Sequence, residues 1–172
     1  MSSSEFTRPL TLIIDGASGA GKTWLANYVR THWRTSRTLV VLHMDDLYRG
    51  WDGLHGATDF LETVVVTARA QRQKFRWQRY DWQKNALAEW NEVPADADLI
   101  IEGCGSITRK TANIADLTVW INADDARRKA LALGRGGENF EHHWNEWDAQ
   151  FQQFCKTHTP ERHASLVLRS TR

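Results

Sequence analysis

LIIDGASGAGKTWL, residues 12–25, places a short apolar run before a glycine-rich loop and the start of a helix-forming segment. Within it, GASGAGKT (16–23) matches G-x-x-x-x-G-K-[ST] at every position, after a predicted strand and before a predicted helix. Glycines at such a turn permit positive φ angles and leave no Cβ in the way of a phosphate. Successive backbone N–H groups then form an anion-binding nest, which the helix dipole strengthens. The stretch therefore predicts a loop that binds the phosphates of a nucleoside triphosphate.

All residues of this loop are candidates for binding ATP: Gly16, Ala17, Ser18, Gly19, Ala20, Gly21, Lys22 and Thr23. In this pattern the lysine reaches the β- and γ-phosphates, and the hydroxyl of the final Thr or Ser ligates Mg²⁺. The loop alone does not define the reaction, because kinases, GTPases, motor ATPases and nucleotide sensors all use it.

The rest of the chain alternates short apolar runs with longer helix-patterned segments. Strands are predicted at 10–15, 38–44, 99–104, 117–122 and 164–169, and helices at 22–34, 58–74, 82–90, 123–133 and 141–156. The strand segments are continuous apolar runs rich in β-branched residues, as in strands covered on both faces. In the last helix, Trp144, Trp147, Phe151 and Phe154 recur at helical spacing and predict an apolar stripe. This order predicts an α/β P-loop NTPase fold in one domain, 1–172, with a five-stranded parallel sheet and helices on both faces.

Composition excludes several classes of partner. The 172 residues include 22 basic and 21 acidic side chains, a balance that argues against a broad nucleic-acid or anionic-lipid surface. The two cysteines, Cys104 and Cys155, provide neither a disulfide framework nor a zinc site, which favours a reducing cytosol. No secretory signal and no run of about 20 apolar residues is present. We therefore expect a cytoplasmic protein with a small-molecule partner, no nucleic acid and no membrane; its oligomeric state stays open.

Two aspartates follow the second predicted strand in HMDDLY. A carboxylate at this strand end can accept a proton from an attacking hydroxyl and can also steer Mg²⁺. Asp45 is the preferred general base and Asp46 the alternative. A turn or helix-capping pair is the competing interpretation.

A third carboxylate ends the strand in ADLIIEGC. Glu102 stands where P-loop proteins place the acid that holds the metal directly or through water. Thr23 and Glu102 are therefore the candidate Mg²⁺ ligands, and the competing interpretation of Glu102 is an acid that simply ends a strand.

Taken together, these motifs resemble a known family. The glycine loop, DDLY (45–48), RYDW (79–82), IIEG (100–103) and an arginine-bearing segment (124–135) occur in the order of the uridine kinase-like branch of P-loop kinases. The chain is also similar to short bacterial P-loop proteins labelled uridine kinase-like or ATP-binding, and the resemblance covers about residues 10–135.

The resemblance implies roles for residues on the acceptor side. Asp45 would be the catalytic base, Tyr48 would line the acceptor pocket, and Tyr80 would pack on a nucleoside base, with Asp81 beside it as a further substrate residue. Trp51, Trp77 and Trp82 flank the same motifs, where they form either a flat apolar slot or part of the core.

Two residues and one length depart from the family pattern. Gln78 replaces a proline and Asn85 replaces an expected histidine, which weakens a uracil assignment. The stretch from Asp45 to Tyr80 is shorter than in authentic uridine kinases, which leaves open whether a hairpin that grips the nucleoside is present.

Residues 124–142 resemble the lid of these kinases, whose arginines stabilise charge on the transferring phosphoryl group. Arg127 and Arg135 are the candidate catalytic arginines, with Arg128 as a further candidate, and the glycines at 134, 136 and 137 would let the lid move.

The expected activity is ATP- and Mg²⁺-dependent phosphoryl transfer to a hydroxyl of a small acceptor. The first candidate acceptor is a uridine- or cytidine-like nucleoside, and the catalytic set is Asp45, Lys22, Arg127 and Arg135. The alternative is a regulatory protein that binds ATP without phosphorylating an acceptor. A nucleotide hydrolase ranks third, because neither a water-orienting residue nor a coupling partner is evident.

Overall fold

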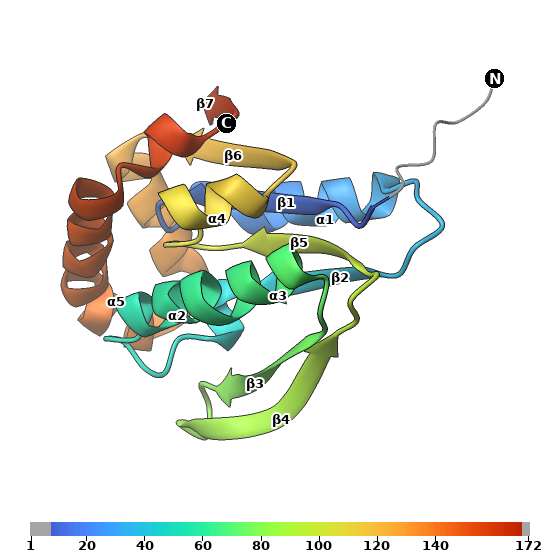
Figure 1. Ribbon diagram of the computed structural model, residues 1–172. Helices are drawn as coiled ribbons and strands as arrows, with labels where there is room; N and C mark the ends of the chain where they lie inside the picture. Colours follow the sequence, from blue (N-terminus) through green and yellow to red (C-terminus); the bar gives the residue numbers. More distant parts are fainter. Residues whose placement is uncertain (1–7, 170–172) are drawn as a thin grey trace.

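The computed structural model describes residues 8–169, and for residues 135–139 it describes the backbone alone. Its centre is a parallel sheet in the order β2-β5-β1-β6-β7 (Figure 1). The strands are β1 (Thr11–Gly16), β2 (Leu39–His43), β5 (Asp98–Glu102), β6 (Leu117–Asn122) and β7 (Leu166–Arg169). All five predicted strands are confirmed, each end lying within two residues of the expected position.

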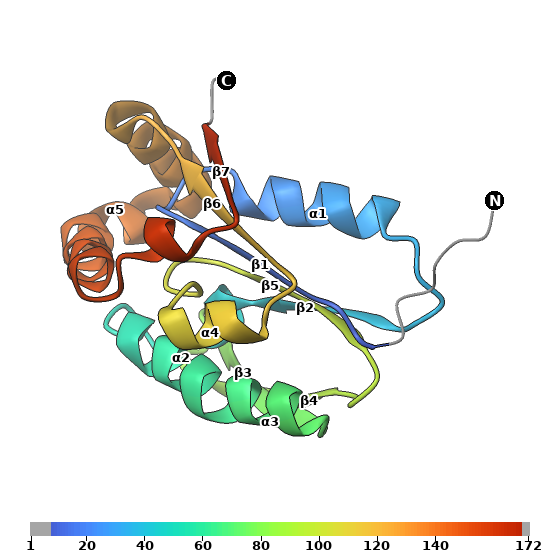
Figure 2. The same cartoon turned by 45° about the horizontal axis from the view of Figure 1, so that its top comes forward.

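Helices cover both faces of this sheet (Figure 2). One face carries α1 (Lys22–His32), and the other carries α4 (Arg109–Ile114) and a longer helical segment. That segment consists of α2 (Leu54–Phe60), the π-helical η2 (Leu61–Val65) and α3 (Val66–Gln71), so it begins four residues before the predicted start. Within residues 8–169, no helix is both long and apolar enough for a bilayer span.

A single helix, α5 (Asp125–His158), replaces the two helices predicted at 123–133 and 141–156. It begins with Asp124 as N-cap, whose carboxylate accepts a hydrogen bond from the Arg127 backbone N–H at 3.1 Å. The helix runs through its glycines because each costs only about 1 kcal/mol there, whereas its buried stripe anchors the helix to the sheet. Trp147, Phe151 and Phe154 of that stripe are at most 5 % exposed. A short 3₁₀ turn, η3 (Pro160–His163), then leads into β7.

The predicted helix over 82–90 is wrong: the region belongs to an antiparallel hairpin of β3 (Phe75–Asp81) and β4 (Ala86–Val93). Residues 82–85 form its turn, where the Asp81 carboxylate accepts hydrogen bonds from the backbone N–H groups of Gln83 and Lys84, both at 3.0 Å. Residues 86–90 are good helix formers, but cross-strand pairing with β3 overrides that local preference. The chain thus has a hairpin at residues 75–93, whose first strand overlaps the end of the short 45–80 stretch.

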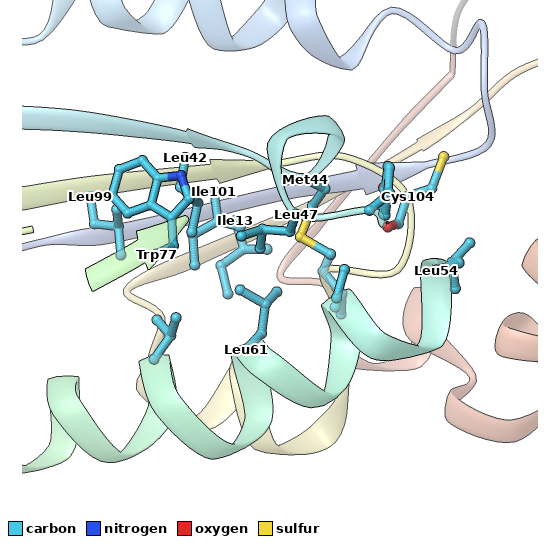
Figure 3. Close-up of a cluster of buried hydrophobic side chains, with 14 of the residues drawn as sticks. Ile13, Leu42, Met44, Leu47, Leu54, Leu61, Trp77, Leu99, Ile101 and Cys104 are labelled. Carbon is cyan, nitrogen blue, oxygen red and sulfur yellow. Dashed lines mark hydrogen bonds between the residues drawn. The ribbon is translucent and has the colours of Figure 1, made fainter. Parts of the chain in front are cut away.

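The sheet separates two cores because successive side chains of each strand point to opposite faces. Ile13, Leu42 and Ile101 pack toward α2 and α3, whereas Leu12, Ile14 and Ile100 pack toward α1. Figure 3 shows the larger core, in which Trp77 of the hairpin lies near Leu42 and Leu99. Trp77 therefore anchors the hairpin to the domain.

Carboxyl-terminal strand ends position the site. β1 leads into the glycine loop, β2 into the 3₁₀ turn η1 (Met44–Asp46), and β5 ends at Glu102. α5 lies at the same end of the sheet (Figures 1 and 2). The fold thus brings the predicted phosphate, acid and lid segments to one edge.

Candidate active site

The glycine loop joins β1 to α1 with backbone angles that favour glycine. Gly19 has φ +82° and Gly21 has φ +99°. A Cβ on Gly19 would lie 2.0 Å from the backbone oxygen of Arg128, so the loop packs directly against the first turn of α5. Gly19 is therefore required both for the loop conformation and for the close approach of α5.

Lys22 lies folded back over this loop. Its buried Nζ donates hydrogen bonds to the carbonyl oxygens of Gly16 and Ala17, both at 2.9 Å, and lies 3.4 Å from Cys104 Sγ. Burial lowers the pKa of Lys22, but the surrounding acidic groups, with Cys104 and Glu102 foremost, raise it above its ordinary value. The amine therefore stays charged in a site that could receive phosphate oxygens.

Thr23 and Glu102 form a corner of hard oxygen donors. Thr23 Oγ1 donates to the Glu102 carboxylate at 3.3 and 3.4 Å, and the same carboxylate is 2.6 Å from His43 Nδ1. This hydrogen bond raises the pKa of His43. Within the described part of the chain no cluster of three or more His, Cys, Asp or Glu side chains could hold a metal. A hydroxyl and a carboxylate nevertheless fit Mg²⁺, which binds through one or two protein oxygens together with substrate phosphates.

Asp45 and Asp46 follow β2 in η1, and only Asp45 lines the cleft. Asp45 keeps solvent access through the cleft mouth, yet the surrounding protein desolvates its carboxyl, which together with nearby Glu102 raises its pKa. Burial also raises the pKa of Asp46, while His43 and Arg79 act in the opposite direction. The geometry therefore favours Asp45 over Asp46 as the acid that could meet a ligand.

These residues surround a single cleft of about 450 Å³. Its lining residues are Ser18, Gly19, Lys22, Thr23, Asp45, Tyr48, Trp51, Trp82, Glu102, Gly103, Cys104, Ala132, Phe140 and Trp147. The structure thus brings the loop lysine and threonine, the strand-end acids and two of the flanking tryptophans to one place.

The residues predicted on the acceptor side do not all reach the cleft. Tyr48 is buried in its wall and donates its hydroxyl to the Cys104 carbonyl oxygen at 2.7 Å. Tyr80 is buried in the hairpin, where its hydroxyl donates to the side-chain oxygen of Asn85, and Asp81 caps the hairpin turn. Neither Tyr80 nor Asp81 is a lining residue.

Two of the predicted arginines, Arg127 and Arg128, do not line the cleft. Arg127 is exposed in the first turn of α5. Arg128 is buried, and its guanidinium contacts the carboxylates of Asp125 at 2.7 Å and Asp148 at 2.9 Å. The side chain of Arg135 lies outside the described residues.

Three residues of the site were not predicted. Asp15 accepts hydrogen bonds from the backbone N–H groups of Gly16, Gly105 and Ile107, at 2.6, 3.1 and 2.8 Å. Cys104 contacts Lys22, and the Trp147 indole N–H donates to Ser18 Oγ at 2.9 Å. The sequence pattern predicts that Trp147 belongs to a buried stripe. Its hydrogen-bond partner Ser18 is 129 residues away, so this contact could be identified only from the fold.

No family model matches the chain, and no curated protein matches it. Among solved structures it is similar to a protein of Bacillus stearothermophilus described as a possible uridine kinase, with a TM-score of 0.66 and 21 % identity over 95 % of this chain and 90 % of that one. It is also similar to a candidate fructose transport system kinase of Silicibacter sp. TM1040, with a TM-score of 0.58 and 15 % identity over 96 % and 92 % of the two chains. These neighbours share its sheet and flanking helices, so the chain has the fold of P-loop small-molecule kinases.

Proposed function

We propose that the protein transfers a phosphoryl group from ATP, with Mg²⁺, to a hydroxyl group of a small acceptor. The observation that supports this most directly is the convergence of Lys22, Thr23, Asp45 and Glu102 on one cleft. Lys22 and Thr23 lie where the glycine loop enters α1, whereas Asp45 and Glu102 lie at the ends of the neighbouring strands β2 and β5, so their meeting is a property of the fold.

Each residue has a chemical role in this proposal. The loop amides and Lys22 hold the triphosphate, and Lys22 exchanges its bonds to the Gly16 and Ala17 carbonyls for bonds to phosphate oxygens. Thr23 and Glu102 hold Mg²⁺, which supplies neutralisation of charge on the phosphates. Asp45 accepts the proton of the acceptor hydroxyl, and its raised pKa makes it a stronger base than an ordinary aspartate.

The arginines enter the proposal through α5. Arg127 and Arg135 stabilise charge on the transferring phosphoryl group as lid residues. Because Arg127 is exposed and outside the cleft lining, this role requires the amino-terminal part of α5 to move toward the phosphates. Such a movement is a lid closure of the kind that excludes water from phosphoryl transfer.

A nucleoside is the acceptor that the sequence resemblance suggests. A second candidate function is regulation by ATP binding alone. It is favoured by Tyr80 and Asp81, which are engaged within the hairpin rather than exposed to a ligand.

The test compares Asp45→Asn with Asp46→Asn, a matched change at the adjacent residue outside the cleft lining. We expect Asp45→Asn to lower acceptor-dependent turnover by about 10²–10⁴, the usual contribution of a general base, and to leave MgATP affinity nearly unchanged. Release of ADP with a panel of hydroxylic metabolites measures turnover, and calorimetry measures MgATP binding.

Lys22→Ala should weaken MgATP binding under either candidate function, so it tests the phosphate loop, and the acceptor panel separates the two functions. Full turnover in Asp45→Asn would remove Asp45 from the mechanism. Tight MgATP binding by the wild type with no acceptor-stimulated ADP release across the panel would favour the regulatory protein.

A further inference from the structure

The cleft lining includes polar and aromatic side chains. Lys22, Thr23 and Glu102 contribute the polar groups, and Trp51, Trp82 and Phe140 form an aromatic wall. The indole N–H of Trp82 donates to the backbone oxygen of Asp45 at 2.9 Å. The aromatic wall therefore begins directly beside the proposed base, on the acceptor side.

Trp51 is the centre of this wall. Its ring centroid lies 4.8 Å from that of Trp82. Two side chains of α5 stack nearly parallel to it, Phe140 at 5.4 Å and 17° and His143 at 4.7 Å and 10°. The backbone oxygen of Trp51 accepts a hydrogen bond from Gln150 Nε2 at 2.6 Å. The loop after η1, the hairpin and α5 thus hold the wall together, and half-buried Trp51 still faces the cleft.

Three polar groups beside this wall are already engaged within the protein. The Trp82 indole N–H is bonded to Asp45, the Trp147 N–H to Ser18, and the Tyr48 hydroxyl to a backbone oxygen. A ligand with many polar groups on this side would leave some of them unpaired, which costs binding free energy.

Charged groups surround the Asp45 carboxyl. Besides burial, Glu102 and Asp46 raise the pKa of Asp45. Lys22 and His43 lower the same pKa. Charges of both signs therefore surround the reacting hydroxyl, and the restriction on the ligand comes from the aromatic wall.

We propose that the acceptor is an alcohol that bears an aromatic or alicyclic ring; this inference rests on the proposed kinase function. The ring packs against Trp51 and Trp82, and the hydroxyl points to Asp45. The hydroxyl proton passes to the Asp45 carboxylate while its oxygen forms a bond to the γ-phosphorus of ATP. The bond from that phosphorus to the bridging oxygen breaks, and its electron pair leaves with ADP.

The test measures binding and transfer separately. Ligand-observed NMR, with Mg²⁺ and a non-hydrolysable ATP analogue present, compares 2-phenylethanol and cyclohexylmethanol with uridine and glycerate. ³¹P NMR with MgATP then follows phosphate-ester formation from each alcohol. We expect the ring alcohols to bind at least about tenfold more tightly than uridine or glycerate, because burial of apolar ring surface drives the contact, and to be phosphorylated.

Two tryptophan variants locate the ring. Trp51→Ala should weaken ring-alcohol binding about tenfold and leave MgATP affinity unchanged. Trp90→Ala, a matched change at an exposed hairpin position outside the cleft lining, should alter neither. Weaker MgATP binding in Trp51→Ala would mean that the wall holds the adenine ring, which would overturn the inference.

The remaining outcomes separate this inference from the kinase proposal. Phosphorylation of uridine with no binding of ring alcohols overturns the acceptor class and leaves the kinase function standing. Binding of ring alcohols with no phosphate ester from any compound supports the ligand class and overturns the kinase function. Failure of the wild type to bind any ring alcohol overturns the inference, whatever the variants do.

Discussion

Asp15 is fully buried at the end of β1, where its carboxylate joins two loops of the site. One oxygen accepts the backbone N–H groups of Gly16 and Gly105, and the other accepts that of Ile107. Asp15 thereby fixes the start of the glycine loop relative to the segment after β5. The position of Cys104 and Glu102 against Lys22 depends on the same connection.

The protonation of Asp15 should make stability depend on pH. Burial raises its pKa to about 6, against the effect of its backbone hydrogen bonds and of Lys22, whereas the ordinary value is 3.8. Between these two pKa values the native state holds more protons than the unfolded chain. The stabilisation that protonated Asp15 contributes is therefore fully present below the lower pKa and is lost as pH rises through about 6. The difference between the two pKa values corresponds to roughly 3 kcal/mol in the free energy of unfolding.

Urea unfolding of the wild type and of Asp15→Asn, at several pH values from about 4 to 7, measures this effect. We expect the wild type to lose stability relative to the variant as pH rises through this window. If the wild type instead gains stability relative to Asp15→Asn as pH rises, the three amide hydrogen bonds favour the ionised carboxylate more strongly than burial opposes it.

The loop and the first turn of α5 are coupled elements, because Gly19 touches the Arg128 backbone. Gly19→Ala would place a side chain at φ +82° and a Cβ 2.0 Å from a backbone oxygen. We expect it to lower the free energy of unfolding by about 2 kcal/mol or more, since strain at positive φ and displacement of α5 add. Chemical denaturation measures the change.

Gly134→Ala is the matched control within α5. A Cβ there meets nothing within 4 Å, and alanine favours a helix over glycine, so we expect stabilisation by about 0.5–1 kcal/mol. Equal destabilisation by the two alanines would contradict the contact at Gly19. Lower turnover in Gly134→Ala would support a lid that bends at this glycine.

Sequence patterns were most informative where the signal is local. The glycine loop and five strands follow from motif spacing and continuous apolar runs, which neighbouring residues determine. β4 was missed because its side chains are largely exposed and its residues 86–90 suit a helix, so only pairing with β3 determines its conformation.

The positions of site residues required the order of the strands. Asp45 and Glu102 meet because β2 lies beside β5. This pairing brings His43 and Glu102 together, although they are 59 positions apart in the sequence. Periodicity predicted that Trp147 is buried but could not assign it to Ser18. The arginines of 124–135 were assigned by family pattern, which does not specify how a helix is placed relative to a cleft.

At the scale of the whole molecule, α5 connects the cleft to the larger core. Phe140 and Trp147 line the cleft, while Phe151 and Phe154 lie farther along the same helix in the core beneath the sheet. Trp120 of β6 stacks on Phe151 at 6.1 Å, so this part of α5 is packed on the sheet. The proposed movement of the lid therefore belongs to the amino-terminal part of α5, and the carboxyl-terminal part should unfold with the rest of the domain.

Phe154→Ala tests whether α5 and the sheet unfold together. Phe154 is 0 % exposed and stacks on His158 at 4.8 Å, so truncation leaves a cavity in the larger core and should cost about 3–5 kcal/mol. If the chain folds as one domain, far-UV circular dichroism and tryptophan fluorescence will report the same shifted urea transition, because loss of α5 packing destabilises every element at once. Leu87→Ala, an exposed change on β4, should shift that transition by no more than about 0.5 kcal/mol. Two separate transitions in Phe154→Ala, with the sheet unfolding at the wild-type denaturant concentration, would show instead that α5 and the sheet are independent units.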